Sequence, residues 1–315
     1  MTAIEVRELS KEYGGVRAVD GLTFSVRPGR VTGFLGPNGS GKSTTMRLVL
    51  GLDRPTSGTA QVAGRGYAEL DRPLRHVGAL LDPQAAHGSR TARSHLLALA
   101  ASNRIPARRV GEVLDEVGLA NVARRRIRTY SLGMRQRLGI AAALLGDPAV
   151  LMLDEPTNGL DPEGIIWIRE LMRSLADEGR TVLVSSHLMA ETAATADHLV
   201  VLGRGRLLAD TSMREFIDAS GTPQVRLRTT DPDRLSAVLA RLGYAARPAD
   251  DGRWTVDGAR AEDIGTIAAR EGIAILELSD QQASLEQAYL DLTATETSHA
   301  AAPRAAAAPT TRQEV

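Results

Sequence analysis

One run of residues carries the strongest structural signal in this sequence: Gly36-Pro37-Asn38-Gly39-Ser40-Gly41-Lys42-Ser43. It matches the pattern G-x-x-x-x-G-K-[ST] at every fixed position. The apolar segment Val31–Leu35 precedes it, and a helical pattern from Lys42 to Leu50, closed by Gly51, follows it. Glycines allow backbone N–H groups to turn inward around an anion, and the start of a helix adds partial positive charge. This strand, loop and helix therefore predict a phosphate-binding loop.

The side chains at the end of this loop predict a nucleotide with its metal ion. We expect the amine of Lys42 to reach the β- and γ-phosphates and the hydroxyl of Ser43 to ligate Mg²⁺. A second motif supports this, because four apolar residues, Val150–Leu153, run into Asp154 and Glu155. We expect Asp154 to hold the metal through water and Glu155 to act as general base on the attacking water. Taken alone, such a segment is more often a strand that enters a loop.

The hydrophobic pattern around these motifs predicts an α/β domain over residues 1–220. Short β-branched runs alternate with helical patterns, as in a mostly parallel sheet with crossover helices. The predicted strands include Val31–Leu35, Val150–Leu153, Thr181–Ser185 and His198–Leu202. Residues 91–145 show a helical pattern and no convincing strand, so we expect a helical insert over about residues 88–145.

From about Thr222 a new series of strand and helix patterns begins, which predicts a small α+β domain over residues 221–292. Strand patterns cover 224–228, 253–256 and 273–278, and helical patterns cover 231–243, 261–271 and 284–292. We expect this domain to be ferredoxin-like. The tail from 293 to 315 consists of Ala, Thr, Pro and a few charges, and we expect it to be disordered because it has too little apolar bulk to offset the entropy of ordering.

Composition argues against several classes of protein. The 38 basic residues balance the 38 acidic ones, which offers no overall electrostatic footprint for nucleic acid or an anionic membrane surface. The absence of cysteine excludes disulfides and thiolate metal sites and points to a reducing compartment. The most apolar stretch, Leu138–Leu153, contains Asp147 and Pro148 and is shorter than the ~20 residues of a membrane span. With no secretory signal pattern either, we expect a cytoplasmic chain that does not cross a membrane by itself.

A run upstream of the carboxylate motif resembles a family signature. Residues 130–134, Tyr-Ser-Leu-Gly-Met, are similar to the L-S-G-G-Q signature of ATP-binding cassette (ABC) ATPases, with matches at Ser131 and Gly133. Without that resemblance, Ser131 is the cap of an amphipathic helix that continues through Leu145. The resemblance implies that the Ser131 hydroxyl and the Gly133 N–H face the γ-phosphate of a nucleotide held by a second protomer.

Further positions match motifs of the ABC ATPase family in order and spacing, over about residues 4–215. The resemblance implies that Asp161, in Gly159-Leu160-Asp161, belongs to the loop by which two protomers communicate at the nucleotide. It implies a γ-phosphate contact for His187 and adenine stacking for Tyr13, and it adds Thr44 to the nucleotide site. Without it, His187 is a structural or solvated histidine and Tyr13 is a surface tyrosine near a turn.

Besides Tyr130, Leu132 and Met134 in the signature, one more position departs from the family. The family places a glutamine after the strand that precedes the helical insert, where it bridges Mg²⁺ and the membrane partner. Aligning Val77–Leu81 with that strand puts Asp82 there, with Gln84 two residues later. We expect Asp82 to be a ligand on the metal side, because carboxylate oxygen suits Mg²⁺. The alternatives are that Gln84 supplies the ligand, or that Asp82 only caps the following turn.

The resemblance also implies a function. The signature, together with the C-terminal domain, resembles the ATPases of bacterial daunorubicin- and bacitracin-resistance exporters. It implies a homodimer that binds ATP and Mg²⁺ and lies beneath a separate membrane permease, on the inner face of the cell membrane. The alternative is a non-transport ABC ATPase that acts on the ribosome or on nucleic acid. Such proteins usually carry two cassettes or a long coiled coil, whereas this chain has one phosphate loop and no sustained heptads.

Overall fold

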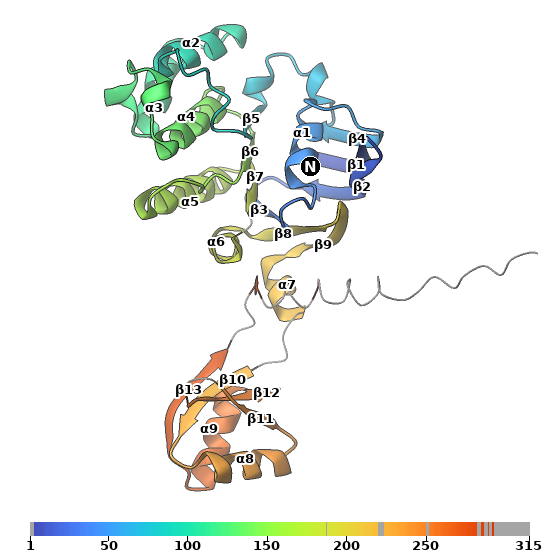
Figure 1. The fold of residues 1–315 in the computed structure, drawn as a ribbon, viewed down its shortest axis with the longest axis vertical. Coiled ribbons are helices and arrows are strands. Elements are labelled where there is room, and N and C mark those ends of the chain that lie inside the picture. Colours follow the sequence, from blue (N-terminus) through green and yellow to red (C-terminus); the bar gives the residue numbers. More distant parts are fainter. Residues whose placement is uncertain are drawn as a thin grey trace, which may run out of the picture. The chain divides into compact units, whose positions relative to one another are not determined.

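A computed structural model describes residues 3–186, 188–219, 224–249 and 252–281, together with Leu285, Glu286, Tyr289 and Leu292. The chain divides into two compact units, Met1–Glu215 and Phe216–Val315 (Figure 1). Within the described ranges, none of the helices has the length and apolar character needed to cross a membrane.

A six-stranded sheet forms the centre of the first unit, in the order β5-β6-β7-β3-β8-β9. The strands from β5 to β8 in this order are parallel, and β9 pairs antiparallel with β8. The bounds are β3 Arg30–Leu35, β5 Val77–Leu80, β6 Val150–Asp154, β7 Thr181–Ser186, β8 His198–Gly203 and β9 Arg206–Ser212. The central strands are almost entirely buried, as expected for a parallel sheet covered on both faces. The predicted mostly parallel sheet is therefore confirmed.

Helices cover the two faces of this sheet. Helix α1 (Lys42–Val49) contacts β6 and also a three-stranded antiparallel sheet of order β2-β1-β4. Helices α5 (Pro162–Asp177) and α6 (Met189–Thr195) contact β3 and β7 on the opposite side (Figure 1). The antiparallel strands are β1 Ile4–Tyr13, β2 Val16–Val26 and β4 Ser57–Val62, and the short helices η1 Tyr67–Glu69 and η2 Pro73–Arg75 lead to β5. One hydrophobic core joins α1 to strands of both sheets.

The helical insert lies between β5 and β6 in sequence. It contains α2 Ala92–Ser102, α3 Arg108–Glu116, η3 Ala120–Val122, η4 Ile127–Thr129 and α4 Leu132–Leu144. The three α-helices contact one another, and α4 also packs against β5. The predicted insert is thus present, and its last helix connects directly to the carboxylate strand β6.

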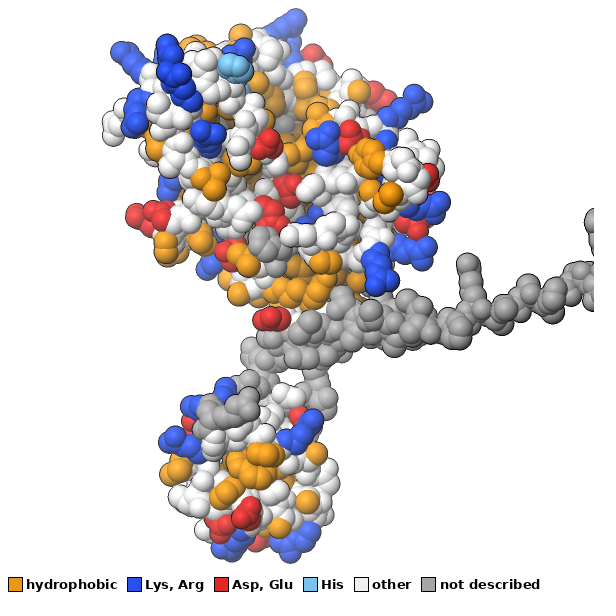
Figure 2. All heavy atoms as spheres, viewed as in Figure 1, with side chains coloured by type: hydrophobic (Ala, Val, Ile, Leu, Met, Phe, Trp, Pro, Cys, Tyr) orange, Lys and Arg blue, Asp and Glu red, His pale blue; other side chains and the backbone are white. Residues whose placement is uncertain are grey.

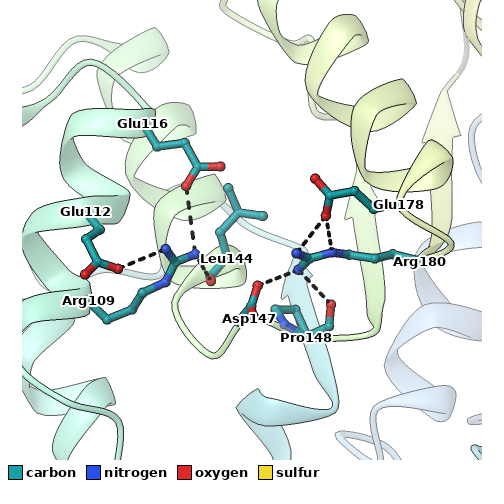
Figure 3. Close-up of polar contacts among 8 residues, drawn as sticks. All are labelled: Arg109, Glu112, Glu116, Leu144, Asp147, Pro148, Glu178 and Arg180. Atoms are coloured by element: carbon teal, nitrogen blue, oxygen red, sulfur yellow. Dashed lines mark hydrogen bonds and ion pairs between the residues drawn. The ribbon is translucent and has the colours of Figure 1, made fainter.

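Two arginines bind the C-terminal end of α4 and the connection from it to β6 (Figure 3). Arg109 of α3 donates to the Leu144 carbonyl at 3.4 Å. Arg180, just before β7, donates to the Asp147 carboxylate at 2.7 Å and to the Pro148 carbonyl at 3.3 Å. Glu112, Glu116 and Glu178 complete these two clusters. Bonds to backbone carbonyls at the α4–β6 connection help to hold the two elements in a fixed relation.

The second unit contains a four-stranded antiparallel sheet of order β11-β12-β10-β13. Its elements are β10 Gln224–Thr229, α8 Pro232–Arg241, β11 Ala245–Pro248, β12 Trp254–Asp257, α9 Ala261–Arg270 and β13 Ile275–Gln281. This β-α-β-β-α-β order with that sheet order is a ferredoxin-like topology, of which the sequence predicted three strands, β10, β12 and β13, and both helices. Helix α7 (Met213–Ala219) spans the division between the units. The predicted helix at 284–292 and the tail from 293 lie outside the described residues, apart from the four named above.

Candidate functional site

Three neighbouring parallel strands end at the same edge of the large sheet. The register aligns Asp154 of β6 with Ser185 of β7, and Ser185 with Phe34 of β3. The loop of residues 36–41 leaves β3 at this edge and enters α1. Ligand sites of open α/β sheets form at the carboxyl ends of the strands, so the phosphate loop and the carboxylates occupy the expected place.

The shape of the phosphate loop depends on glycine at three positions. A Cβ on Gly36 would lie 2.5 Å from the Ser40 hydroxyl oxygen, and a Cβ on Gly41 would lie 2.6 Å from the Ala18 carbonyl oxygen. Gly41 also has φ +103°, in the left-handed region where side chains are strained. Gly39 has φ +81° and no atom near its missing Cβ, so its need for glycine is conformational. The loop is therefore held in a form that only glycine permits.

Lys42 lies buried under this loop at the start of α1. Its amine donates to the carbonyl of Gly36 at 2.6 Å and to that of Pro37 at 3.2 Å. Burial lowers the pKa of the amine, while the negative charges of Glu155 and Asp154 act to raise it. The structure therefore brings Lys42, Asp154 and Glu155 into one electrostatic site.

The two carboxylate residues are held through β7. The Ser185 hydroxyl donates to the Asp154 carboxylate. The backbone N–H of Glu155 donates to the Ser185 hydroxyl at 3.1 Å and to its carbonyl at 3.2 Å. Glu155 has φ +50°, an unusual conformation for a residue with a side chain. Its backbone is thus fixed at the point where the strand ends.

Helix α4 contacts the same point from the insert. Gln136 is 1% exposed, and its side-chain amide donates to the Glu155 carbonyl at 3.1 Å. Neither Gln136 nor Ser185 was given a role in the sequence-based site, although both are important to its geometry. A small polar residue at the end of a neighbouring strand was the available signal for Ser185. For Gln136, a polar residue on the buried face of α4 was the signal.

The signature residues lie at the start of α4. Ser131 is exposed and accepts a hydrogen bond from the Met134 N–H at 3.2 Å, so it caps the helix. A Cβ on Gly133 would lie 2.8 Å from the Gly159 carbonyl oxygen, which explains why glycine is needed there. Leu132 packs over Gly159 in turn. Among the described contacts, Ser131 and Gly133 meet α4 and this loop rather than residues 36–43 of their own chain.

Tyr13 belongs to a polar network at the tip of the β1–β2 hairpin. Its hydroxyl donates to Asp53 at 2.8 Å, and the Lys11 amine lies 4.7 Å from the centre of its ring. Arg47 of α1 donates to the same carboxylate at 2.7 Å. These bonds from Arg47 and Tyr13 lower the pKa of Asp53 to about 2. The ring remains 45% exposed, as a surface that stacks on a base must be.

The remaining expected residues have local partners. Asp161 accepts a hydrogen bond from the Gly164 N–H at 3.0 Å and caps α5. Asp82 is exposed and accepts one from the Gln84 N–H at 2.7 Å, so it caps the turn after β5. These bonds match the turn-capping alternative for Asp82 and leave the metal-side role a prediction. His187 lies outside the described residues, directly after Ser186 at the end of β7.

The donor set is of the kind that binds Mg²⁺ together with phosphate. No group of three or more His, Cys, Asp or Glu side chains forms a metal cage within the described part of the chain. The exposed Ser43 hydroxyl and the half-buried Asp154 carboxylate are the oxygen donors at the phosphate loop. Mg²⁺ usually keeps several waters and binds through one or two protein oxygens plus substrate phosphates. These residues therefore fit the metal.

Comparison with known proteins agrees with this geometry. Residues 19–158 match the family model described as ABC transporter. The bacitracin transport ATP-binding protein of Bacillus licheniformis is 42% identical over 212 residues, which are 66% of this chain and 69% of that protein. The daunorubicin/doxorubicin resistance ATP-binding protein of Streptomyces peucetius is 36% identical over 306 residues, 92% of each chain. The chain belongs to the ABC transporter family.

The solved structures confirm the fold of the cassette. A structure described as the ATP-binding subunit of an ABC transporter matches with a TM-score of 0.64 and 28% identity, over 69% of this chain and 93% of that one. Residues 223–286 match a separate family model, described only as a domain of unknown function, DUF8746. The ABC ATPase fold and the resemblance to bacitracin and daunorubicin systems, both predicted from the sequence, are thereby confirmed. Within the family, the chain is a nucleotide-binding subunit of a transporter.

Proposed function

We propose that the chain binds and hydrolyses ATP with Mg²⁺ as one half of a homodimer, and that it drives export of a drug- or antibiotic-like compound through a separate membrane permease. The observation that supports this most is the sheet edge at which Lys42, Asp154 and Glu155 meet beneath the glycine loop. The transport and resistance relatives support the export of such compounds.

Each residue of this edge has a chemical task in the proposal. The Lys42 amine clamps the β- and γ-phosphates, because its bonds to negatively charged phosphate oxygens are stronger than its bonds to neutral backbone carbonyls. The Glu155 carboxylate accepts a proton from the water whose oxygen attacks the γ-phosphorus, and ADP leaves with the electrons of the broken P–O bond. Ser43 and Asp154 hold Mg²⁺, which neutralises phosphate charge when bound.

The exposed start of α4 supports the homodimer. Ser131 is exposed, and among the described contacts Ser131 and Gly133 meet α4 and the loop at Gly159, so a second protomer has room to place its nucleotide against them. One chain carries the phosphate loop, the carboxylates and the signature, so two copies make two equivalent sites. ATP then joins the protomers, and its hydrolysis releases them.

An apolar groove supports a permease partner. It measures about 470 Å³ and is lined by the end of α1, by β5 and the turn after it, and by α2 and α4. Leu52 lies on its rim and is 56% exposed. A helical segment of a permease fits such a groove through apolar contacts. We expect Leu52→Asp to reduce co-purification with the permease at least about tenfold, because a buried unpaired charge is costly at an interface.

A matched control exists in the second unit. Leu276 is 57% exposed, and Leu276→Asp introduces the same charge outside the groove. Co-expression with the permease, detergent extraction and quantitative pull-down measure the effect. Equal recovery of the permease by the Leu52 and Leu276 variants would contradict docking in the groove.

Steady-state phosphate release tests the catalytic part of the proposal. We expect Glu155→Gln to lower turnover by about 100-fold or more, since the amide cannot take the proton, a step usually worth 10²–10⁴-fold. ATP binding, measured with a fluorescent analogue, should remain. Lys42→Ala should instead weaken ATP binding itself, and chelation of Mg²⁺ should stop turnover in the parent protein. Parental turnover in the Glu155 variant would remove Glu155 from the mechanism.

A further inference from the structure

A cluster of exposed arginines lies on the helical insert of the first unit. Two backbone segments, residues 88–93 and 123–128, run side by side there, and the Ile127 N–H donates to the Arg90 carbonyl at 2.9 Å. Together they carry six exposed arginines, which we call the arginine patch: Arg90, Arg93, Arg124, Arg125, Arg126 and Arg128. Figure 2 shows Lys and Arg side chains gathered at the end of the unit where Figure 1 places α2 and α3.

The charge of the arginine patch is not balanced locally. The sequence has no Asp or Glu between residues 83 and 111 or between residues 117 and 146, although the whole chain is neutral. Within the described part of the molecule, no ion pair is found for any arginine of the patch. Arg109, on the nearby helix α3, shows the contrast, because it pairs with Glu112 and Glu116. The neutral composition therefore hides a strongly cationic surface.

The arginine patch is charged but has neither an exposed apolar pocket nor an aromatic residue in its two segments. The apolar residues of its two segments, Ala92, Ala123 and Ile127, are buried and supply no apolar hollow for a peptide anchor. Neither segment contains an aromatic residue on which a nucleic-acid base could stack. A surface of this kind fits a diffuse array of anionic groups better than a single shaped ligand.

The patch borders the apolar groove. His95 lines the groove, and its pKa is lowered first by burial and then by the positive charge of Arg90. Residues 85 and 86 also line the groove and lead directly into the segment that starts at residue 88. A permease seated in the groove would hold this side of the insert towards the membrane in which the permease lies.

We propose that the arginine patch binds the phosphate headgroups of anionic phospholipids at the membrane surface. The orientation rests on the proposed function, while the binding itself needs neither ATP nor a permease. A guanidinium group bonds phosphate oxygens in pairs, and clusters of four to eight basic residues are attracted to anionic leaflets. The patch thereby orients the ATPase beneath the bilayer and raises its local concentration near the permease.

Vesicle flotation with the full-length chain tests the proposal. Vesicles of phosphatidylcholine alone are compared with vesicles that contain about 30% phosphatidylglycerol, at low and at raised salt. We expect binding only to the anionic vesicles, and binding that weakens as salt rises. The combined change Arg124→Gln, Arg125→Gln and Arg126→Gln should lower vesicle affinity more than about tenfold, since each arginine near an anionic surface contributes several-fold.

A charge-matched control separates the patch from net charge. Arg27, Arg54 and Arg65 are exposed and lie outside the patch, and their change to Gln should alter vesicle affinity less than about twofold. ATP turnover without vesicles checks folding and is expected to be unchanged in both triple variants. Equal losses in the two variants, equal binding to both kinds of vesicle, or no vesicle binding at low salt would overturn the proposal. If the chain bound no vesicles at low salt but still bound an acidic peptide of the permease, the arginine patch would be a protein-binding surface instead.

Discussion

At the residue scale, Glu155 shows how the fold holds a reactive side chain in place. A residue other than glycine with positive φ costs of order 1 kcal/mol, and Glu155 has φ +50°. Its N–H donates to the hydroxyl and to the carbonyl of Ser185, its carbonyl accepts from the side-chain amide of Gln136, and these bonds offset that cost. Strand β7 and helix α4 therefore fix the backbone of Glu155 jointly, which links the start of α4 to the end of the carboxylate strand.

The hydrogen bond between Asp53 and Tyr13 can be tested by single substitutions. It ties the Tyr13 hydroxyl to α1, the helix that follows the phosphate loop. If Tyr13 stacks on adenine, we expect Asp53→Ala to weaken ATP binding about fivefold, the worth of one hydrogen bond of ~1 kcal/mol. Titration with a fluorescent ATP analogue measures this. The bonds of Asp53 also stabilise the folded state. Because they depress its pKa to about 2, this contribution to folding stability is fully present above the unfolded pKa near 4 and is lost as pH falls towards 2.

Tyr13→Phe is the control for this prediction, since it keeps the ring and removes the hydroxyl. The two single variants and the double variant form a cycle in which the losses should not add, because both remove the same bond. Additive losses would show that Asp53 acts on ATP binding by another route.

Local motifs made the residues of the loop and the carboxylate strand predictable from sequence. Lys42 lies in one short pattern, Asp154 and Glu155 lie in another, and the spacing within each pattern indicates its chemistry. The partners Gln136 and Asp53 were not predicted as such. Their contacts join positions 19 and 40 residues apart, and only the packed structure brings those positions together.

At the element scale, the parallel strands were predictable because their apolar runs are continuous. The antiparallel sheet was harder to predict from β1, where Ile4 and Val6 are buried but the next buried residue is Leu9. An irregularity at Glu8, with φ +46°, shifts the alternation by one residue. Strand β11 in the second unit was missed because Ala245–Pro248 has weak strand propensity and ends in proline, which an edge strand tolerates.

The turn after β5 carries a prediction of its own. Asp82 caps this turn through the Gln84 N–H, yet its carboxylate is exposed, and its second oxygen has no hydrogen bond to any residue that the structure describes. We still expect Asp82→Ala to lower Mg²⁺-dependent turnover or its coupling to transport, by about tenfold for the loss of one metal-side oxygen. Phosphate release at a series of Mg²⁺ concentrations should show a raised metal requirement.

Gln84→Ala is the matched comparison for that turn, because Gln84 lies two residues away and donates only its backbone N–H to the cap. Its turnover should stay close to the parent value. The opposite order of effects, with Gln84→Ala the more damaging, would transfer the ligand role to Gln84 and leave Asp82 as a turn cap.

At the scale of the whole molecule, the site residues and the second unit are separate in sequence. All the residues that we assign to ATP chemistry lie before residue 190, within the unit that ends at Glu215. The ferredoxin-like unit has its own hydrophobic core, formed between its sheet and helices α8 and α9. The sequence predicted the fold class of both units. The net charge of zero gave no indication of the arginine patch, because a net charge does not show where the charged residues lie.

In the proposed dimer, two copies of the chain enclose ATP between the phosphate loop of one and Ser131 of the other. Light scattering on the Glu155→Gln variant with saturating Mg²⁺ and ATP tests it most directly, because bound ATP then persists. We expect the mass to double on addition of ATP, and adding Lys42→Ala or Ser131→Arg should keep the protein monomeric. A single-chain mass, with ATP shown to be bound, would contradict the account.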